Sequence, residues 1–379
     1  MKKLAVIGAS YLQEPLIEKA KDMGIETHVF AWAADDVGEK SADYFYPISI
    51  VDKEDILHRC QEIGIDGICS IASDLAAITV NYVAYNLGLI GNSPACTEKS
   101  TNKHKMRECF KENGDPSPLS ICVESVTDLE DVKLKYPVIV KPLDRSGSRG
   151  ITKVMREEDL ETAIEYAKSQ GFDKRALVEE FVCGEEYSVE CISWQGKHKL
   201  LNVTKKYTTG APGFIETGHM EPALLSDEIK LKIKDIIFHA LDSLGIEYGA
   251  SHSEIKIDGD VIQIIEIGGR MGGDYIGSHL VELSTGIDFV KAVIQIAMGE
   301  EPEFVSNGER YVAGVRFVFT DKDTEVLKKL KDEKPDILVL EDVHQEFNEA
   351  VNDSSERNGE FIFAGESYEE IAGYLPEDE

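Results

Sequence analysis

The segment Ser251-His-Ser-Glu-Ile-Lys-Ile-Asp-Gly-Asp-Val-Ile-Gln-Ile-Ile-Glu266 has the pattern of two β-strands joined by a tight turn. β-Branched residues alternate with polar ones on both sides of Asp258-Gly259, a dipeptide typical of hairpin turns. The register decides what the hairpin can bind, because successive side chains of a strand point to opposite faces. A two-residue turn at Asp258-Gly259 places Glu254 and Glu266 on opposite faces. A three-residue loop over residues 258–260 places them on one face, as diagonal neighbours about 7–8 Å apart.

We expect the three-residue loop, which pairs Ile257 with Val261 and Glu254 with Ile264, because it also forms a continuous apolar face. That face would consist of Ile255, Ile257, Val261, Ile265 and Ile267. On the other face, Glu254 and Glu266 would offer two carboxylates to Mg²⁺ or Mn²⁺, which favour oxygen ligands and often share them with substrate phosphates. Two exposed glutamates on a solvated sheet are the alternative, and for an isolated hairpin this is the commoner case.

A second informative stretch lies upstream. Residues Tyr136–Lys141 form an apolar strand that ends in a lysine, and the glycine-rich loop Pro142–Gly150 and a strand over Ile151–Met155 follow it. The backbone N–H groups of such a loop can surround phosphate oxygens, and Arg145 and Arg149 would add positive charge. A flexible hairpin tip is the alternative for a loop of this composition.

The strand Ala176–Val182 continues into a glutamate-rich stretch that ends at Tyr187. Glu179 could accept a hydrogen bond from an adenine amino group, the backbone near Val182 could pair with the edge of the ring, and Glu186 could hold ribose hydroxyls. A surface strand rich in glutamate is the alternative. Single lysines such as Lys103, Lys205 and Lys206 are most often solvated.

The first 95 residues alternate between strands and helices, which predicts a parallel sheet with helical crossovers. The expected strands are Leu4–Gly8, Glu26–Phe30 and Gly67–Ile71, and the expected helices are Glu14–Met23, Ile56–Ile63 and Ala76–Leu87. The first strand-to-helix turn, Gly8-Ala9-Ser10, lacks the GxGxxG pattern of dinucleotide-binding folds, which argues against a dehydrogenase.

The texture changes after Pro94, where a basic helical stretch over Lys99–Lys111 precedes a region dominated by strands. Further helices are expected near Asp159–Ser169 and over Asp227–Leu244. Residues 301–379 are rich in Asp and Glu, and we interpret them as a smaller α+β unit with a solvated acidic surface.

Composition narrows the function further. The chain has 379 residues and a net charge of −31, from 40 Lys and Arg against 71 Asp and Glu. We expect a protein with this negative charge to bind neither nucleic acid nor anionic membranes, because both are polyanions. No apolar run approaches the roughly 18 residues that span a bilayer. The seven cysteines contain no CxxC pair, so we expect reduced, mostly buried thiols, no zinc site and a cytoplasmic protein.

Taken in order, the polar residues above resemble the ATP-grasp superfamily. The matching positions are Lys103, Lys141, the 146–150 loop, Glu179 to Glu186, Lys206, Glu254 and Glu266-x-Gly268-x-Arg270. The likeness covers roughly residues 1–300 and is strongest to the carboxylate–amine ligases, especially bacterial L-amino-acid (dipeptide) ligases. The segment Phe214–Pro222 and the glycine run Gly268–Asp274 carry that narrower likeness.

The resemblance implies an α/β and α+β protein with three parts. An N-terminal parallel-sheet pre-ATP-grasp domain would occupy residues 1–95, and a small C-terminal α+β subdomain would occupy residues 301–379. The two-lobed ATP-grasp domain would lie between them over residues 96–300, with a nucleotide lobe at about 115–190 and a metal and substrate lobe at about 191–300. A homodimer is a further expectation from the family.

The resemblance also implies roles for individual residues. The ATP phosphates would contact Lys103, Lys141, Lys206 and the loop residues Ser146, Gly147, Ser148 and Gly150. Adenine and ribose would contact Glu179, the backbone of Val182, and Glu186. Glu254 and Glu266 would bind Mg²⁺ or Mn²⁺, Arg270 would face the reacting carboxyl group, and His219 would line the substrate pocket.

One position departs from the family. Many relatives have Asn two residues after the second metal-binding glutamate, whereas this chain has Gly268. Water or a substrate oxygen would then complete the coordination of one cation. A positive φ angle at Gly268-Gly269 is a structural alternative, since glycine adopts it readily.

The chemistry implied is activation of a small carboxylate, such as an amino acid, as an acyl-phosphate by ATP, followed by capture by an amine. Two other readings stay open. One is a purine-pathway ATP-grasp enzyme that transfers a formyl or carboxyl group, and the other is an ATP-binding regulatory protein without turnover. The substrates would be a small-molecule carboxylate and an amine.

Overall fold

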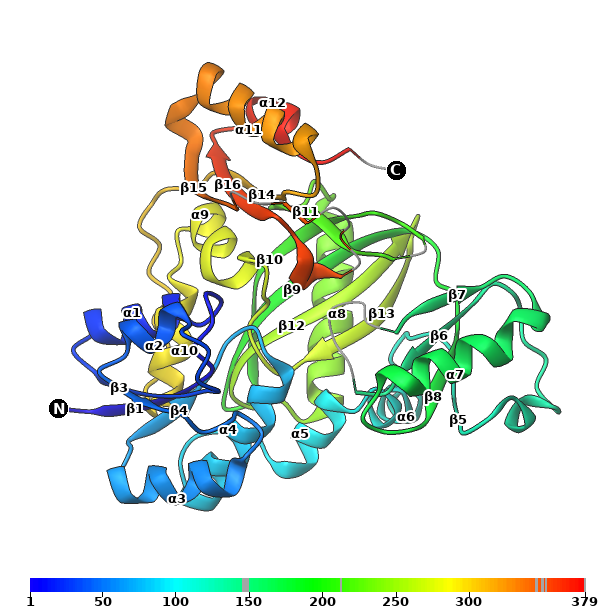
Figure 1. The fold of residues 1–379 in the computed structure, drawn as a ribbon, viewed down its shortest axis with the longest axis horizontal. Coiled ribbons are helices and arrows are strands. Elements are labelled where there is room, and N and C mark those ends of the chain that lie inside the picture. Colours follow the sequence, from blue (N-terminus) through cyan, green and yellow to red (C-terminus); the bar gives the residue numbers. More distant parts are fainter. Residues whose placement is uncertain (145–149, 212, 345–346, 349–350, 352, 378–379) are drawn as a thin grey trace.

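We describe a computed structural model of the chain over residues 1–144, 150–211, 213–344, 347–348, 351 and 353–377. These residues form three sheets: a parallel sheet of order β3-β2-β1-β4, an antiparallel sheet of order β5-β8-β6-β7, and an eight-stranded antiparallel sheet. The large sheet lies centrally, with the parallel sheet on one side and the small antiparallel sheet on the other (Figure 1). The predicted mixed α/β architecture with an N-terminal parallel sheet is confirmed.

The N-terminal unit is the parallel sheet with its helices. Its elements are β1 (Lys3–Ile7), α1 (Glu14–Asp22), β2 (Glu26–Phe30), α2 (Val37–Ser41), β3 (Tyr44–Tyr46), α3 (Lys53–Ile63), β4 (Gly67–Cys69) and α4 (Asp74–Leu87). Strands β1, β2 and β4 are almost fully buried because helices cover both faces of a parallel sheet, whereas the edge strand β3 is partly exposed. The short strand β3 and helix α2 were not predicted.

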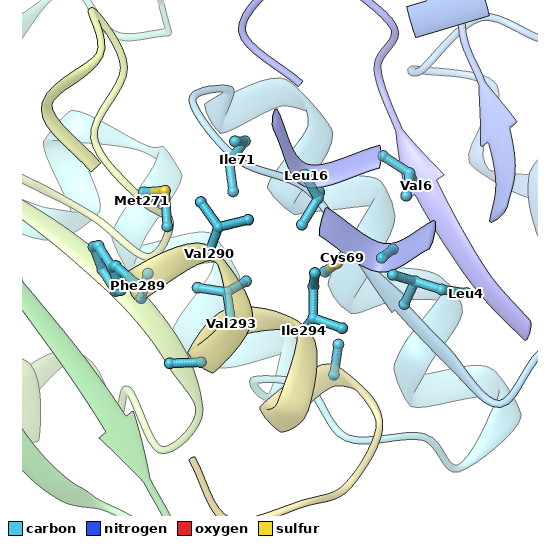
Figure 2. Packing of buried hydrophobic residues seen from close by; sticks show 14 of the residues in the cluster. Leu4, Val6, Leu16, Cys69, Ile71, Met271, Phe289, Val290, Val293 and Ile294 are labelled. Atoms are coloured by element: carbon cyan, nitrogen blue, oxygen red, sulfur yellow. The ribbon is translucent and has the colours of Figure 1, made fainter. Parts of the chain in front are cut away.

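A helix from much later in the chain completes this core. Helix α10 (Phe289–Ala297) is buried nearly all round, and its side chains join those of β1, α1 and β4 in one cluster (Figure 2). The backbones also approach closely, since a Cβ on Gly67 would lie 2.4 Å from the carbonyl oxygen of Ala297. The N-terminal unit and the rest of the molecule therefore share a core.

Two helices lead into the small sheet, α5 (Pro94–Thr101) and α6 (Lys103–Asn113). The single helix predicted over residues 99–111 is wrong, because Asn102 adopts an extended conformation and its side chain accepts a hydrogen bond from the backbone N–H of Lys105. An N-cap of this kind begins a new helix. As a result, Lys103 stands at the first position of α6.

The small sheet packs on one helix. Its elements are β5 (Ser120–Val123), β6 (Val138–Pro142), β7 (Thr152–Val154), α7 (Leu160–Gln170) and β8 (Ala176–Glu180). Alanine and isoleucine side chains of α7 pack against the valines of β6 and β8. This places Lys141, near the end of β6, and Glu179, near the end of β8, on neighbouring strands.

The large sheet has the order β13-β12-β9-β10-β11-β14-β16-β15. Its strands are β9 (Glu185–Trp194), β10 (Lys197–Thr208), β11 (Glu216–Glu221), β12 (Gly249–Asp258), β13 (Val261–Gly268), β14 (Val312–Phe317), β15 (Leu338–Val343) and β16 (Gly359–Gly365). Its helices are α8 (Asp227–Leu244), α9 (Val281–Thr285), α11 (Asp321–Glu333) and α12 (Tyr368–Ile371). The strands of the acidic C-terminal segment, β14 to β16, thus continue the central sheet.

The hairpin β12–β13 differs in register from the prediction. Asp258 pairs with Val261, so the turn is Gly259-Asp260 and the predicted loop over 258–260 is wrong. A bulge at Ile265 then shifts the ladder by one residue, and Glu254 pairs directly with Glu266. The shared face of the two glutamates is confirmed, but they are direct partners and not diagonal neighbours.

The bulge is needed because the register set by the two-residue turn would point the wrong side chains of β13 into the core. With the observed turn and no bulge, Glu266 would point into the apolar face and Ile265 would oppose Glu254. The buried apolar face consists of Ile255, Ile257, Ile262, Ile264 and Ile267. The predicted members Val261 and Ile265 do not belong to it, since Val261 is 59% exposed and Ile265 lines a cavity on the opposite face.

Two further expectations concern cysteines and membranes. All seven cysteines are unpaired, and five of them are buried, as predicted: Cys60, Cys69, Cys96, Cys109 and Cys191. Among the described residues, no helix combines the length and apolar character needed to cross a bilayer.

Candidate active site

One face of the large sheet is apolar and packs on the core, and the other face is polar and carries the candidate site. Residues such as Val189, Val203 and Ile255 face the apolar side of α8. Alternate residues on the same strands point the other way, so that Glu254 neighbours Ser188 and His252 neighbours Glu190 across β12 and β9. Ser188, Glu190 and His252 on the polar face are buried, and the N-terminal unit and the small sheet both contribute side chains to the cavity on this face.

A cavity of about 190 Å³ opens on this polar face. Its walls include residues from α4 of the N-terminal unit, from α6, from strands of the small sheet and from the strands β9 to β13. The basic residues in its lining are Lys103, Lys141, Lys206, Lys256 and Arg270, and the acidic ones are Asp74, Glu179, Glu180, Glu186, Glu216, Glu254 and Glu266. The cavity therefore collects opposite charges at close quarters.

Lys206 of β10 is at the centre of one charge cluster. Its Nζ lies 2.8 Å from Glu254, 3.0 Å from Glu186 and 3.5 Å from Glu216. Burial alone would lower the pKa of Lys206, but these carboxylates raise it well above its usual range. Conversely, burial alone would raise the pKa of Glu254, but Lys206 holds it well below its usual range. Both groups are therefore charged at neutral pH.

Lys103 forms a second pair with Glu266, the partner of Glu254 across the hairpin. Burial alone would lower the pKa of Lys103, whereas Glu266 raises it. The two predicted metal-binding carboxylates each accept from a lysine. Within the described residues, no group of three or more His, Cys, Asp or Glu side chains is placed to hold a metal ion. Two carboxylates still fit a Mg²⁺ ion that takes its other ligands from phosphates and water.

Lys141 belongs to a buried triad. Its Nζ lies 2.6 Å from Glu179, whose other carboxylate oxygen accepts from Arg107 Nε at 2.8 Å. Arg107 also donates to the carbonyl oxygen of Ile265 at 2.6 Å and so links the small sheet to the hairpin. Burial alone would raise the pKa of Glu179, but the two cations lower it to about 2. Burial lowers the pKa of Lys141 despite the opposing effect of Glu179.

Arg270 lies just after the hairpin and is held by the N-terminal unit. Its Nε and one Nη donate to the two carboxylate oxygens of Asp74 at 2.8 and 3.0 Å, and the other Nη donates to the carbonyl oxygen of Met271 at 3.2 Å. Burial alone would raise the pKa of Asp74, but Arg270 lowers it. Asp74 was not anticipated from the sequence.

A buried histidine faces the same part of the cavity. His252 Nδ1 contacts Glu190, a fully buried carboxylate that also accepts from the backbone N–H of Gly272 at 3.1 Å. Its Nε2 lies 3.7 Å from Glu254. Burial alone would lower the pKa of His252, but Glu190 raises it to about 9.

His219 is buried beside the cavity and not in its lining. Its Nε2 lies 3.6 Å from Asp274, and neither ring nitrogen has a hydrogen-bond partner in the described part of the structure. Burial lowers the pKa of His219. Arg357 from the C-terminal segment bridges Asp274 at 3.0 Å and Glu216 at 3.2 Å, so this segment also contributes to the polar face.

The far end of the cavity is less charged. Val182 and Phe181, which follow β8, lie there with Pro118, Ile139, Ile151 and Ile265. Glu186 stands at its edge, within 3.0 Å of Lys206 and 3.8 Å of Lys256. Apolar lining residues with a carboxylate beside them suit a nucleoside.

The structure thus brings together nine of the residues singled out from the sequence, all in the cavity lining: Lys103, Lys141, Glu179, Val182, Glu186, Lys206, Glu254, Glu266 and Arg270. His219 and Gly150 lie outside the lining, and Gly150 is buried against Pro142 and Gln170. Ser146, Gly147 and Ser148 lie outside the described residues.

Sequence reasoning missed five polar residues of this region: Asp74, Arg107, Glu190, His252 and Arg357. Their partners are far away in the sequence, as for Asp74 and Arg270, which are 196 positions apart. The sequence offers one signal for Arg107: it lies on the same helix face as the apolar residues Met106 and Phe110, which indicates that its side chain is buried.

Comparisons with known proteins agree with this geometry. Residues 134–278 match the ATP-grasp domain family. Alanine–anticapsin ligase of Bacillus amyloliquefaciens is 30% identical over 254 residues, which cover 57% of this chain and 53% of that protein. The chain spans about half the length of the curated relatives it matches.

Solved structures match over nearly the whole chain. An L-amino acid ligase from Bacillus licheniformis superposes with a TM-score of 0.82 and 26% identity, covering 99% of this chain and 96% of that one. An N5-carboxyaminoimidazole synthetase from Staphylococcus aureus, complexed with ADP, has a TM-score of 0.78 and 16% identity over 99% and 97% of the two chains, and that likeness shows the fold alone. The chain therefore contains an ATP-grasp domain, and the resemblance to amino-acid ligases inferred from the sequence is confirmed.

Proposed function

We propose that this chain, which contains an ATP-grasp domain, is an ATP-dependent carboxylate–amine ligase. A carboxylate oxygen of a small acid, in our proposal an amino acid, attacks the γ-phosphorus of ATP, and the bond to the β-phosphate oxygen breaks to release ADP. An amine nitrogen then attacks the carbon of the acyl-phosphate. The C–O bond to phosphate breaks, phosphate leaves, and the nitrogen gives up a proton as the amide forms.

The observation that carries this proposal is the pairing of Glu254 with Glu266 inside a cavity that also holds Lys103, Lys206 and Arg270. Attack of a carboxylate on a triphosphate brings two anions together, so the site must supply positive charge where they meet. The whole chain carries a net charge of −31, so the protein as a whole offers no such field. The cationic side chains of the cavity lining would therefore supply this charge, together with the Mg²⁺ that Glu254 and Glu266 would hold.

The residues divide by their place in the cavity. We assign the phosphates of ATP to Lys103, Lys141 and Lys206. Glu254 and Glu266 would hold Mg²⁺, which, when bound, neutralises the charge that develops between the phosphates. Arg270 offers N–H donors to the reacting carboxylate or to the acyl-phosphate oxygens, for which its planar fork is suited.

The nucleoside would occupy the apolar end of the cavity. We assign the adenine edge to the backbone of Val182 and the ribose hydroxyls to Glu186, since both residues line the cavity. Because both oxygens of Glu179 accept from cations, we assign Glu179 to fixing Lys141. We still predict that the loop containing Ser146 to Ser148 covers the triphosphate and keeps water from the acyl-phosphate.

The test is a phosphate-release screen of amino acids, singly and in pairs, with ATP and Mg²⁺. We expect release with particular pairs, and a product whose mass equals the sum of the two amino acids minus water. Glu266→Gln should abolish release without unfolding the protein. The matched control is Asp260→Asn, the same carboxylate-to-amide change at the exposed tip of the same hairpin, which should keep full activity.

Three outcomes would contradict the proposal. Near-full activity of Glu266→Gln would exclude metal binding there. Nucleotide binding without phosphate release for any pair would favour an ATP-binding regulatory protein. Release with an aminoimidazole ribonucleotide and bicarbonate would favour the purine-pathway reading, although the described lining offers no separate basic cluster for a ribose phosphate beyond the five cations named above.

A further inference from the structure

We propose that Asp74 is a positioning residue that fixes the guanidinium group of Arg270 for the ligation reaction. The inference rests on the proposed function, and it makes the N-terminal unit a direct participant in the chemistry. None of the residue roles derived above includes Asp74.

The contact between the two side chains is specific. Two N–H groups of Arg270 meet the two oxygens of Asp74 at 2.8 and 3.0 Å, and a third meets the carbonyl oxygen of Met271. A guanidinium group has five N–H donors, so two remain for a substrate. The paired edge fixes the plane of the group, and the remaining donors then point in a defined direction.

Arg270 needs such a support because its own segment is glycine-rich. Gly268 and Gly269 precede it, and Gly272 and Gly273 follow Met271. Glycine restricts the backbone least, so the local chain does little to hold an arginine in place. By contrast, Asp74 is the first residue of α4, whose N-cap Ser73 accepts a hydrogen bond from the backbone N–H of Ala76. The anchor is therefore more rigid than the residue it holds.

Gly268 provides the space for this pair. A Cβ at position 268 would lie 2.9 Å from Asp74 Oδ1 and 3.3 Å from Arg270 Nε. The φ angle of Gly268 is not positive, so the positive-φ alternative raised from the sequence is wrong for this residue. Glycine at 268 is explained by the approach of Asp74 and Arg270, and the side chain that many relatives carry there would displace them.

Both side chains line the cavity beside Glu254 and Glu266, where the phosphates and the acid would meet. The side chains of Arg270 and Asp74 are 17% and 22% exposed, so the pair is only partly screened by solvent. Loss of Asp74 would leave Arg270 charged but free to turn. A misplacement of about 1 Å can cost about 10²-fold in rate, even when the chemical groups are all present.

The first experiment needs no substrate. Arginine labelled at Cζ and Nη reports rotation about the Cζ–Nε bond by NMR, and the resonance of Arg270 is identified by its loss in Arg270→Lys. We expect slow rotation in the full-length protein and fast rotation in Asp74→Asn. Equal rotation in both proteins would overturn the proposal, whether or not the ligase activity is found.

The second experiment measures the reaction with the most active acid and amine from the phosphate-release screen. We expect Asp74→Asn to lower kcat about 10²-fold, with less than a twofold change in the KM for ATP. Asp74→Glu, which keeps the carboxylate, should recover part of the loss. A purely structural role would instead change the KM for ATP and the melting temperature together, and that result would contradict the proposal.

The matched control is Asp55→Asn. Asp55 lies in the first turn of α3 in the same N-terminal unit, and it is exposed. It reproduces the loss of a negative charge near a helix N-terminus. We expect full activity from this variant. Absence of phosphate release from the unmodified protein would refute the proposed ligase, while the NMR result would still decide whether Asp74 holds Arg270.

Discussion

At the scale of single residues, the site consists of buried charges whose partners are distant in the sequence. Glu179 is the clearest case, because it compensates both Lys141 and Arg107 in a region with little solvent. Removing one partner of a buried ion pair leaves the other charge uncompensated, which costs more than the pair itself contributes.

We therefore predict that Glu179→Gln lowers the free energy of unfolding by about 3–5 kcal/mol. The measurement is urea denaturation followed by circular dichroism. Glu180→Gln makes the same change at the adjacent, exposed residue and should cost less than about 0.5 kcal/mol. Equal effects of the two variants would show that the Arg107–Glu179–Lys141 triad does not contribute to stability.

A second buried carboxylate predicts how stability depends on pH. Glu221 accepts hydrogen bonds from Thr204 at 2.8 Å and from Ser284 at 2.9 Å, and burial raises its pKa from 4.5 to about 8. Between these two pKa values, the folded state keeps a proton that the unfolded state has lost. The contribution of Glu221 to stability is thus complete below pH 4.5 and declines as pH rises to about 8.

The decline should approach about 1.4 kcal/mol per pH unit within this window. Glu221→Gln has no proton to lose, so its free energy of unfolding should fall less between pH 6 and pH 8 than that of the unmodified protein. Urea denaturation at the two pH values measures the difference. Glu158→Gln, at an exposed position, should leave the slope unchanged. A slope that Glu221→Gln does not alter would mean that Glu221 is ionised in the folded state.

At the scale of elements, hydrophobic periodicity predicted most helices and strands, because burial of an apolar face fixes them. It predicted that Glu254 and Glu266 share a face, but it did not predict the turn and the bulge that bring them there. The observed turn at Gly259-Asp260 is one residue shorter than the predicted loop, and the bulge at Ile265 adds one residue, so the two glutamates still share a face. The register is decided by the packing of the isoleucines against α8, which the sequence pattern does not show. The break at Asn102 was missed, although Thr101 and Asn102 are weaker helix formers than the lysines around them and Asn is a preferred N-cap residue.

The turn between β8 and β9 is another feature of this scale. Gly184 has a φ of +107°, and a Cβ there would lie 2.2 Å from the carbonyl oxygen of Ile257 at the end of β12. We predict that Gly184→Ala is strongly destabilising, because the new methyl group meets backbone that cannot move without opening the sheet. Gly196→Ala is the control, since Gly196 also has a positive φ but has nothing within 4 Å of a Cβ.

Strain alone should cost the control about 1 kcal/mol, and Gly184→Ala should cost at least about 2 kcal/mol. Urea denaturation measures both values. Nucleotide affinity should also fall in Gly184→Ala alone, because Gly184 sets the approach of β8 to the large sheet. Equal losses for the two variants would show that backbone conformation, and not close approach, explains the glycine at 184.

At the scale of the whole molecule, helix α10 ties the N-terminal unit to the central sheet. One cluster contains Leu4 and Leu16 from the N-terminal unit together with Ile294 and Phe289 from α10 (Figure 2). Ala250 from β12 belongs to the same cluster. The sequence indicates a boundary near residue 95, where the alternation of strands and helices ends. It does not indicate that α10 packs back into the N-terminal core. The site depends on this tie, because Asp74 belongs to the N-terminal unit and Arg270 follows β13 of the central sheet.

We predict that the two sides unfold together. Ile294 is fully buried in α10, so Ile294→Ala should lower the free energy of unfolding by about 2–5 kcal/mol and Ile294→Val by about 0.5–1.5 kcal/mol. Hydrogen exchange should show an equal loss of protection in β1 and in β12, because both contribute to the cluster around α10. Val305→Ala, at a position 77% exposed, should leave exchange unchanged. If only β1 lost protection, the N-terminal unit would be an independent body, and Asp74 would then be free to move away from Arg270.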